Sequence, residues 1–193
     1  MIQRNIRLDA PGIYLRFPRR SDFGAWSRIR TRDRDHLIPW EPRWPVDANS
    51  SREWRMRRGG WIQAWRDGRG YTFLIFDRKT NTLLGGISLT NIRLGSAQTG
   101  TLGYWLAETA QGQGHMTNAV DEVCQFGKRA IGLMRIEAST VFENERSQAV
   151  LERCGFEREG VAKKYLQIAG TRRDHVLFGK TLILADGIEL SDG

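Results

Sequence analysis

The chain has 193 residues, which is enough for one domain with an adequate hydrophobic core. Its 30 Lys and Arg residues against 22 Asp and Glu residues give a formal net charge of +8, which suits an anionic ligand, a partner rich in nucleic acid or an acidic surface. Residues 1–20 contain no apolar segment typical of a signal peptide, and no apolar run reaches the roughly 18 residues of a membrane span. Cys124 and Cys154 lack metal-type spacing, which favours a reduced, cytoplasmic setting for a soluble protein.

The first third of the chain predicts one strand and two helices. Apolar and polar residues alternate over 13–17, which predicts a strand, and Ser21 is expected to cap a helix over 21–33. Residues 36–47 hold three of the five prolines and predict an ordered loop. A second helix is expected over about 49–67, where two consecutive glycines at 59 and 60 weaken or split it.

The remainder predicts strands and helices in alternation. Two strands over 71–77 and 83–92 form a hairpin, a third strand covers 100–107, and a helix runs from the following glycine-rich turn to about residue 130. A strand over 136–142, a short helix ended by Gly155, and strands near 156–160 and 174–182 complete the order. This order predicts an α/β layer architecture with a mixed sheet. Residues 185–193 read as a polar, acidic tail.

The stretch AQGQGHMTNAV, residues 110–120, places Gly112 and Gly114 directly before the central helix. The first amides of a helix have no internal partner, and glycines allow a phosphate to approach the backbone without interference from a Cβ atom. The amides of residues 112–117 are therefore candidates for a diphosphate cradle. A plain tight turn into a helix would show the same two glycines. The turn is neither a Walker A loop nor a dinucleotide fingerprint, because the Gly-Lys-Ser/Thr sequence and the third glycine are absent.

Three blocks of sequence resemble the GCN5-related N-acetyltransferases (GNAT), and within them the RimJ/RimL type of ribosomal-protein-alanine N-acetyltransferase. Gln111, Gly114 and Met116 fall on the acyl-CoA signature of that family, with Met116 in place of the usual small residue. The pattern N-x-x-S-x-x-V-L-E-x-x-G-F matches residues 144–156, and HLIPWEP and KKYLQIAGTRRDHVL are similar to the RimJ subgroup. The resemblance covers roughly residues 7–184.

The resemblance implies a GNAT fold, with a mixed, mostly antiparallel sheet of about seven strands, splayed in the middle and flanked by about four helices, in one domain over residues 1–184. It also implies acetyl-CoA as co-substrate and direct attack by an amine. The main chain near Leu106 would contact the pantetheine arm or the acetyl carbonyl, and the amides of residues 111–117 would hold the diphosphate. The implied cofactor-binding residues are Tyr104, Trp105, Leu106, Gln111, Gly112, Gln113, Gly114, His115, Met116, Thr117, Asn144 and Ser147.

The catalytic residues are assigned through the same resemblance. Ser147 matches the position that protonates the leaving thiolate, with Tyr165 as a competing acid; the alternatives are a solvated hydroxyl at Ser147 and a core aromatic at Tyr165. Asn144 either contacts the pantetheine arm, caps its helix, or does both. Residues 100–102 carry no carboxylate where many family members carry Glu. Glu41 is the candidate that orients the ammonium group or accepts its proton through a water, against the alternative of a solvated loop acid.

The missing base favours an α-amine as acceptor. An α-amine, with a pKa of about 7.7–8.0, is roughly a tenth to a fifth neutral at pH 7, whereas lysine, near 10.4, is neutral at about one part in two thousand. Trp40, Glu41 and Tyr104 are expected to bind the acceptor, with Trp44 lining the same slot. The basic stretches RMRR and TRRD are either solvated surface or contacts to the 3′-phosphate of the cofactor or to ribosomal RNA.

The leading hypothesis is acetylation of the α-amino group of a ribosomal-protein N-terminus that begins with Ala or Ser. The alternatives are acetylation of a small amine, such as an aminoglycoside, polyamine or amino acid, and a non-catalytic module that binds acyl-CoA or RNA. We expect a protein N-terminus as partner, in association with the ribosome, with no DNA or membrane partner. We also expect no metal, because no His, Cys and Asp set is clustered, and a monomer or weak dimer.

Overall fold

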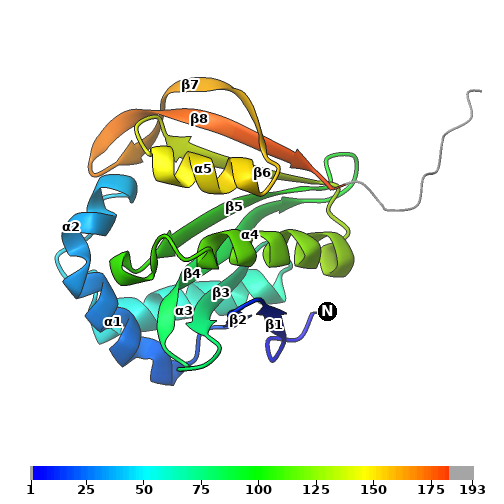
Figure 1. The fold of residues 1–193 in the computed structure, drawn as a ribbon. Coiled ribbons are helices and arrows are strands. Elements are labelled where there is room, and N and C mark those ends of the chain that lie inside the picture. Colours follow the sequence, from blue (N-terminus) through cyan, green and yellow to red (C-terminus); the bar gives the residue numbers. More distant parts are fainter. Residues whose placement is uncertain (1, 183–193) are drawn as a thin grey trace, which may run out of the picture.

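A computed structural model describes residues 2–182, which form one eight-stranded sheet with helices on both faces (Figure 1). The strand order is β1-β2-β3-β4-β5-β6-β8-β7, and every neighbouring pair is antiparallel except β5 and β6. The strands are β1 (Arg7–Ala10), β2 (Ile13–Arg16), β3 (Tyr71–Asp77), β4 (Leu83–Arg93), β5 (Thr99–Leu106), β6 (Arg135–Val141), β7 (Glu157–Ile168) and β8 (Thr171–Thr181). The α-helices are α1 (Phe23–Arg32), α2 (Arg34–Leu37), α3 (Ser51–Arg66), α4 (His115–Phe126) and α5 (Glu145–Arg153).

The helices divide the core into two clusters, one on each face of the sheet. Figure 1 shows α4 crossing the near face, with α3 more distant on the other side. On the α4 side, Val120 and Val123 pack with Phe73 and Ile87 of the central strands. On the other face, a second cluster joins α1 and α3 to the sheet; it contains Trp26, Trp54, Leu74 and Phe76. Because successive side chains of a strand point to opposite faces of the sheet, β3 contributes to both clusters, as the buried residues 73 and 74 show.

Several elements agree with the sequence predictions. The hairpin of β3 and β4, the amphipathic helix α4 and the helix α5 that precedes Gly155 all occur close to the predicted positions. The splayed, mostly antiparallel sheet is confirmed, although it has eight strands and five α-helices instead of about seven and four. The predicted tail over residues 185–193 lies outside the described residues.

Other elements differ from the prediction for identifiable reasons. β1 is an additional strand that pairs with β2 in a short hairpin. The predicted loop over 36–47 begins with the end of α2 and a 3-10 turn (Ile38–Trp40), because Pro39 occupies an early position of that turn where its missing amide costs nothing. β7 extends over 12 residues, and its almost fully exposed edge-strand pattern carries no apolar alternation to predict it.

The helix boundaries also differ from the predicted ones. Ser21 does not cap a helix; it lies within a 3-10 turn (Arg20–Asp22), and α1 begins after Asp22. Helix α3 is continuous through its two glycines, because buried Trp54 and Trp65 anchor it to the core on both sides of them. Helix α4 ends at Phe126 and continues as a π-helical turn (Gly127–Ile131) instead of reaching residue 130 as α-helix.

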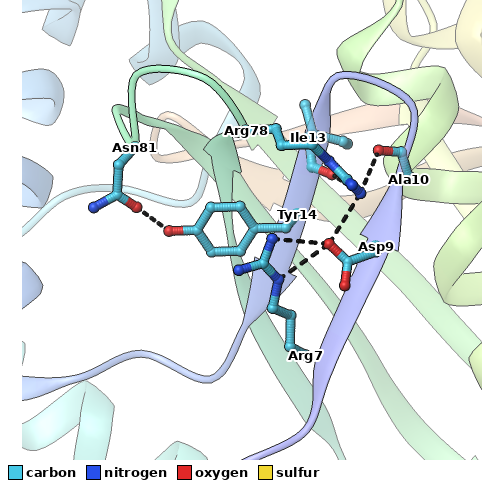
Figure 2. A network of polar contacts seen from close by, with 7 residues as sticks. All are labelled: Arg7, Asp9, Ala10, Ile13, Tyr14, Arg78 and Asn81. Atoms are coloured by element: carbon cyan, nitrogen blue, oxygen red, sulfur yellow. Dashed lines mark hydrogen bonds and ion pairs between the residues drawn. The ribbon is translucent and has the colours of Figure 1, made fainter.

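A polar network attaches the N-terminal hairpin to the turn between β3 and β4 (Figure 2). The carboxylate of Asp9 accepts hydrogen bonds from Arg7 at 2.9 and 3.0 Å and from Arg78 at 2.9 Å. The hydroxyl of Tyr14 donates to the side-chain oxygen of Asn81, and the guanidinium of Arg7 lies 3.9 Å from the centre of the Tyr14 ring. The network therefore fixes this edge of the sheet from side chains on three different segments.

The parallel strands β5 and β6 separate part of the way along their length. They pair only from residues 99 and 135 to residues 102 and 138. Beyond that point β5 continues to Leu106 in pairing with β4 alone, and β6 continues to Val141 in pairing with β8 alone. The sheet is therefore open between the ends of β5 and β6, and α4 and α5 begin next to this opening.

Candidate active site

The main chain of β5 presents free hydrogen-bonding groups to the opening between β5 and β6. Leu106 pairs with Gly85, and the next amide, that of Ala107, donates to the carbonyl of Leu84 at 2.7 Å. Because antiparallel strands bond through alternate residues, the amides of Tyr104 and Leu106 point away from β4, toward the opening. The amide of Leu106 is therefore not used by β4, and its contact with a pantetheine arm or an acetyl carbonyl stays a prediction.

The glycine turn at the start of α4 is open to solvent. Gly112 and Gly114 adopt left-handed backbone with φ of +71° and +77°, and a Cβ atom on either residue would meet no atom within 4 Å. Gly114 is the N-cap of α4 and no side chain caps the helix there, so its first amides and the positive end of its dipole are available to an anion. The side chain of Met116 is buried in the core, which leaves only its main chain for such a contact.

Gln111, the first residue of the predicted signature, is held by two residues that the sequence analysis did not assign. Its side-chain oxygen accepts from Arg146 at 2.9 Å, and its amide nitrogen lies 2.7 Å from Nε2 of His36. Since arginine only donates, the Gln111 amide group must donate to His36, so Nε2 of His36 is an unprotonated acceptor. The contact also brings the cation of Arg146 next to the glycine turn.

The start of α5 is linked to β5 through Ser147 and Tyr104. Asn144 caps α5 by accepting from the amide of Ser147 at 3.1 Å, as the helix-cap alternative predicted. The hydroxyl of Tyr104 lies 2.9 Å from Oγ of Ser147 and 3.1 Å from the Ser147 carbonyl oxygen. Burial raises the pKa of Tyr104 well above its ordinary value of 10.0, so its hydroxyl stays protonated. A neutral pair of hydroxyl groups therefore joins the two sides of the opening.

A cavity of about 240 Å³ lies against Tyr104, between the sheet, α1 and α3. Arg30 is buried there, with 4% of its side chain exposed, and donates to both carboxylate oxygens of Glu41 at 2.9 and 2.6 Å. The indole of Trp44 donates to the same carboxylate at 2.8 Å, and its ring centre lies 4.2 Å from the Arg30 guanidinium. Glu41 is thus a structured component of the cavity wall, and the alternative of a solvated loop acid is wrong.

Trp105 lies on the cavity side of β5. Its ring packs over Gly86, where a Cβ atom would be 2.6 Å from the indole nitrogen, so only glycine leaves room for the ring. By the alternation of β5, the main chain of Trp105 bonds to β4. Its side chain lines the cavity beside Arg30. The side chain of Trp105 therefore lies in the Glu41 cavity and its main chain is used by β4, so neither is directed to the opening between β5 and β6.

The loop that carries Glu41 is covered by the turn between β7 and β8. The amide of Ala169, in that turn, donates to the carbonyl of Glu41 at 2.9 Å. Tyr165 on β7 is 47% exposed and packs edge-on against His175 at 5.8 Å, so the expectation of a core aromatic is wrong. Trp40 is exposed at the end of its 3-10 turn. Within residues 2–182, no hydrogen bond or ring contact joins Tyr165 to Ser147, so the structure does not link the two acid candidates.

Two other chemistries find no support in residues 2–182. Burial raises the pKa of Cys124 and Cys154 to about 12, so both remain thiols at neutral pH and are poor nucleophiles. Within the same residues, no three His, Cys, Asp or Glu side chains are grouped in a way that would hold a metal ion.

None of the helices in this part of the chain has the length and apolar composition to span a membrane.

Comparisons with known proteins agree with this geometry. Residues 13–157 match the acetyltransferase (GNAT) domain. The chain is 31% identical over 176 residues to the [ribosomal protein uS5]-alanine N-acetyltransferase of Escherichia coli, with 91% of each chain covered. It superimposes on Mycobacterium smegmatis RimJ in complex with CoA-disulfide with a TM-score of 0.84, at 35% identity over 91% of this chain and 86% of that one. The ribosomal-protein-S5-alanine acetyltransferase of Vibrio fischeri gives a TM-score of 0.84 at 31% identity, covering 91% and 96%. This chain belongs to the GNAT family of acetyltransferases.

Proposed function

We propose that this protein transfers the acetyl group of acetyl-CoA to the α-amino group of a ribosomal-protein N-terminus that begins with Ala or Ser. The observation that carries the proposal is the opening between β5 and β6, which has a bare helix N-terminus at its edge and Tyr104 shared with the cavity on the other side. Relatives named as uS5-alanine N-acetyltransferases, 31% identical over nine-tenths of the chain, support the same acceptor class.

The residues around the opening fit a CoA thioester. The exposed amides at the start of α4 suit a diphosphate, and Arg146 adds a cation beside them. The outward amides of Tyr104 and Leu106 suit the amide groups of a pantetheine arm. Because Asn144 uses its side-chain oxygen for the helix cap, its amide nitrogen is left to donate to the same arm. The M. smegmatis relative was solved with a CoA disulfide bound.

The proposed reaction is a direct attack of the neutral amine on the thioester carbonyl, in which a C–N bond forms and the C–S bond breaks. The amide of Leu106 would stabilise the oxyanion that develops on the carbonyl oxygen. Ser147, with its Oγ 2.9 Å from the Tyr104 hydroxyl, would pass its hydroxyl proton to the leaving thiolate and regain one, through water, from the proton that the attacking nitrogen loses, so that the products are the acetylated amine and the CoA thiol. Since a thiol has a pKa near 8.5, this acid assistance is modest in size.

The cavity offers little to a polycation. Both of its arginines are paired, Arg30 with Glu41 and Arg57 with Glu53, and Glu41, the one carboxylate of residues 2–182 that lines it, keeps about one free acceptor position. A polyamine or aminoglycoside carries several cations that would find no further carboxylate there, whereas a peptide N-terminus carries a single ammonium group. Among the described residues, Nε of Arg30 is buried without a hydrogen-bond partner, and a peptide carbonyl would satisfy it.

Glu41 is suited to orienting the incoming ammonium group. A carboxylate offers about four acceptor positions, and three of those on Glu41 are used by Arg30 and Trp44, which leaves one for the ammonium. An α-amine loses its proton to water easily enough to need no stronger base. We therefore assign Glu41 a role in binding and not in proton removal.

The test is a thiol-release assay with the purified protein and acetyl-CoA. Peptides with a free N-terminal Ala or Ser should react faster than the same peptides with a blocked α-amine and an internal lysine, and faster than spermidine. Mass spectrometry of the product should place the acetyl group on the α-nitrogen. A preference for spermidine or for lysine would contradict the acceptor assignment, and absence of CoA release with every amine would contradict the enzymatic proposal.

A further inference from the structure

A second cavity, of about 660 Å³, lies away from the opening between β5 and β6, and the proposed reaction does not use it. It is formed by the N-terminal segment 2–6, the end of β2 and the segment after it, and the outer side of α3. Its apolar floor contains Phe17 and Trp65, which are both buried. Its walls are strongly basic, and no carboxylate lines them.

Seven arginines make up what we call the arginine patch: four line the cavity, two more lie on α3, and the seventh, Arg20, lies close enough to Arg58 to lower its pKa. Four of them, Arg52, Arg55, Arg58 and Arg66, lie within an arc of about 120° on α3, because an α-helix turns by about 100° per residue. Glu53 and Arg57, which pair with each other, lie outside that arc. The members of the arginine patch are Arg4, Arg19, Arg20, Arg52, Arg55, Arg58 and Arg66.

The patch is not neutralised by the protein. Within residues 2–182, no ion pair joins any of its seven arginines to a carboxylate. Asp22, the buried acid next to the cavity, pairs instead with Arg16, whose guanidinium nitrogens lie 2.7 and 2.8 Å from its two carboxylate oxygens. Burial lowers the pKa of Arg58, and the charges of Arg20 and Arg4 lower it further. The nearby charge of Asp22 raises the pKa of Arg58 and offsets part of this effect, but it forms no ion pair with a patch arginine in residues 2–182. The patch therefore carries seven formal positive charges in a chain whose net charge is +8.

We propose that the arginine patch binds the phosphodiester backbone of RNA. Its charges are all guanidinium groups, whose planar fork matches phosphate oxygens in a bidentate way. Arg52 and Arg66 are separated by about 21 Å along α3, at 1.5 Å per residue, so the patch spans several phosphates and not the one or two of a small ligand. A membrane surface is a poor match, because interfacial helices present an apolar face and Met56 is the one large exposed apolar side chain on α3.

The choice of RNA rests on the proposed function, since the N-terminus of a ribosomal protein is presented beside ribosomal RNA. Binding through the patch would hold the enzyme near its acceptor without occupying the opening or the Glu41 cavity. The contact is sequence-independent and driven by the release of counterions, so its affinity must fall with salt.

The proposal is tested by fluorescence anisotropy with a fluorescein-labelled hairpin of ribosomal RNA, over a range of KCl concentrations. The variant Arg55→Gln with Arg66→Gln should bind about tenfold more weakly for each arginine removed, and its plot of log affinity against log salt should be shallower by about 2. The matched control is Arg129→Gln with Arg153→Gln, which removes two exposed arginines outside the patch and should bind as the wild type does.

Three outcomes would overturn the proposal: wild-type affinity that does not change with salt, equal weakening in the patch and control variants, and tighter binding to anionic phosphatidylglycerol vesicles than to the RNA. Acetylation of a short free peptide should be unchanged in both variants, because neither changes the acceptor cavity or the glycine turn. This measurement separates the two proposals, since RNA binding can fail while peptide acetylation persists, and peptide acetylation can fail while RNA binding persists.

Discussion

Replacing Gly114 by Asp places a negative charge where the cradle is expected to hold a diphosphate. At a separation of about 5 Å and an effective dielectric constant of about 20, one pair of like charges costs about 3 kcal/mol. That energy corresponds to an acetyl-CoA affinity roughly a hundredfold lower. Because a Cβ atom at Gly114 meets no protein atom within 4 Å, the loss cannot come from a clash within the protein.

A substitution at a second glycine serves as the control for the backbone strain that Gly114→Asp introduces. Gly132 has a φ of +79° and equally open surroundings, so Gly132→Asp imposes the same left-handed backbone, at about 1–2 kcal/mol, far from the cradle. Isothermal titration calorimetry with acetyl-CoA should show weak binding for Gly114→Asp, near wild-type binding for Gly132→Asp, and an intermediate value for Gly114→Ala. Equal affinities of the two Asp variants would refute the cradle.

Two further substitutions test the catalytic pair and the support of the glycine turn. Ser147→Ala should lower kcat by about tenfold to a hundredfold while the acetyl-CoA affinity changes little, because the role proposed for the hydroxyl is to protonate the leaving thiolate; equal kcat values would remove Ser147 as the acid. Asp33, which is buried, accepts from Arg32 at 2.9 Å and from the Glu108 amide at 2.9 Å, and these contacts hold its pKa below the ordinary value of 3.8. Because the pKa of Asp33 is lower in the folded state, its ionised carboxylate stabilises the fold above about pH 4, and this stabilisation is lost as the pH falls through the lowered pKa. Asp33→Asn should therefore lower the free energy of unfolding, measured with urea, by about 1–3 kcal/mol at pH 7 and by clearly less at pH 3. An equal loss at both pH values would contradict the assignment.

The sequence could reveal those parts of the site that are local in the chain. The spacing of Asn144 and Ser147 encodes a helix cap, and the two glycines before α4 encode a left-handed turn into a helix, because both depend on backbone geometry within a few residues. The β3–β4 hairpin and the apolar face of α4 were predicted for the same reason. The length of the exposed edge strand β7 was underestimated because β7 is defined by its pairing with β8 and has no alternating apolar pattern of its own.

The contacts that form the Glu41 cavity could not be predicted from the sequence. Arg30 is one of many arginines in the chain, and nothing near it in sequence indicates that it is buried and paired with Glu41, 11 residues later. The two side-chain contacts of Gln111 could not be predicted either, because His36 lies 75 residues away in the sequence and Arg146 lies 35 residues away. Such contacts depend on how α1, α2 and α5 pack, so no local pattern records them.

The sequence by itself determined the family, through three blocks whose order and spacing can be seen without a structure. It also determined the open turn before α4 and the cap of α5, because each depends on residues that are neighbours along the chain. Only the tertiary structure decided that β5 and β6 part after residues 102 and 138, that Tyr104 meets Ser147 across the opening, and that four arginines of α3 lie on one face near the N-terminal segment without an ion pair in residues 2–182. The physical reason is that strand register and side-chain pairing are set by the packing of distant segments, which fixes where charge and unpaired main-chain groups meet.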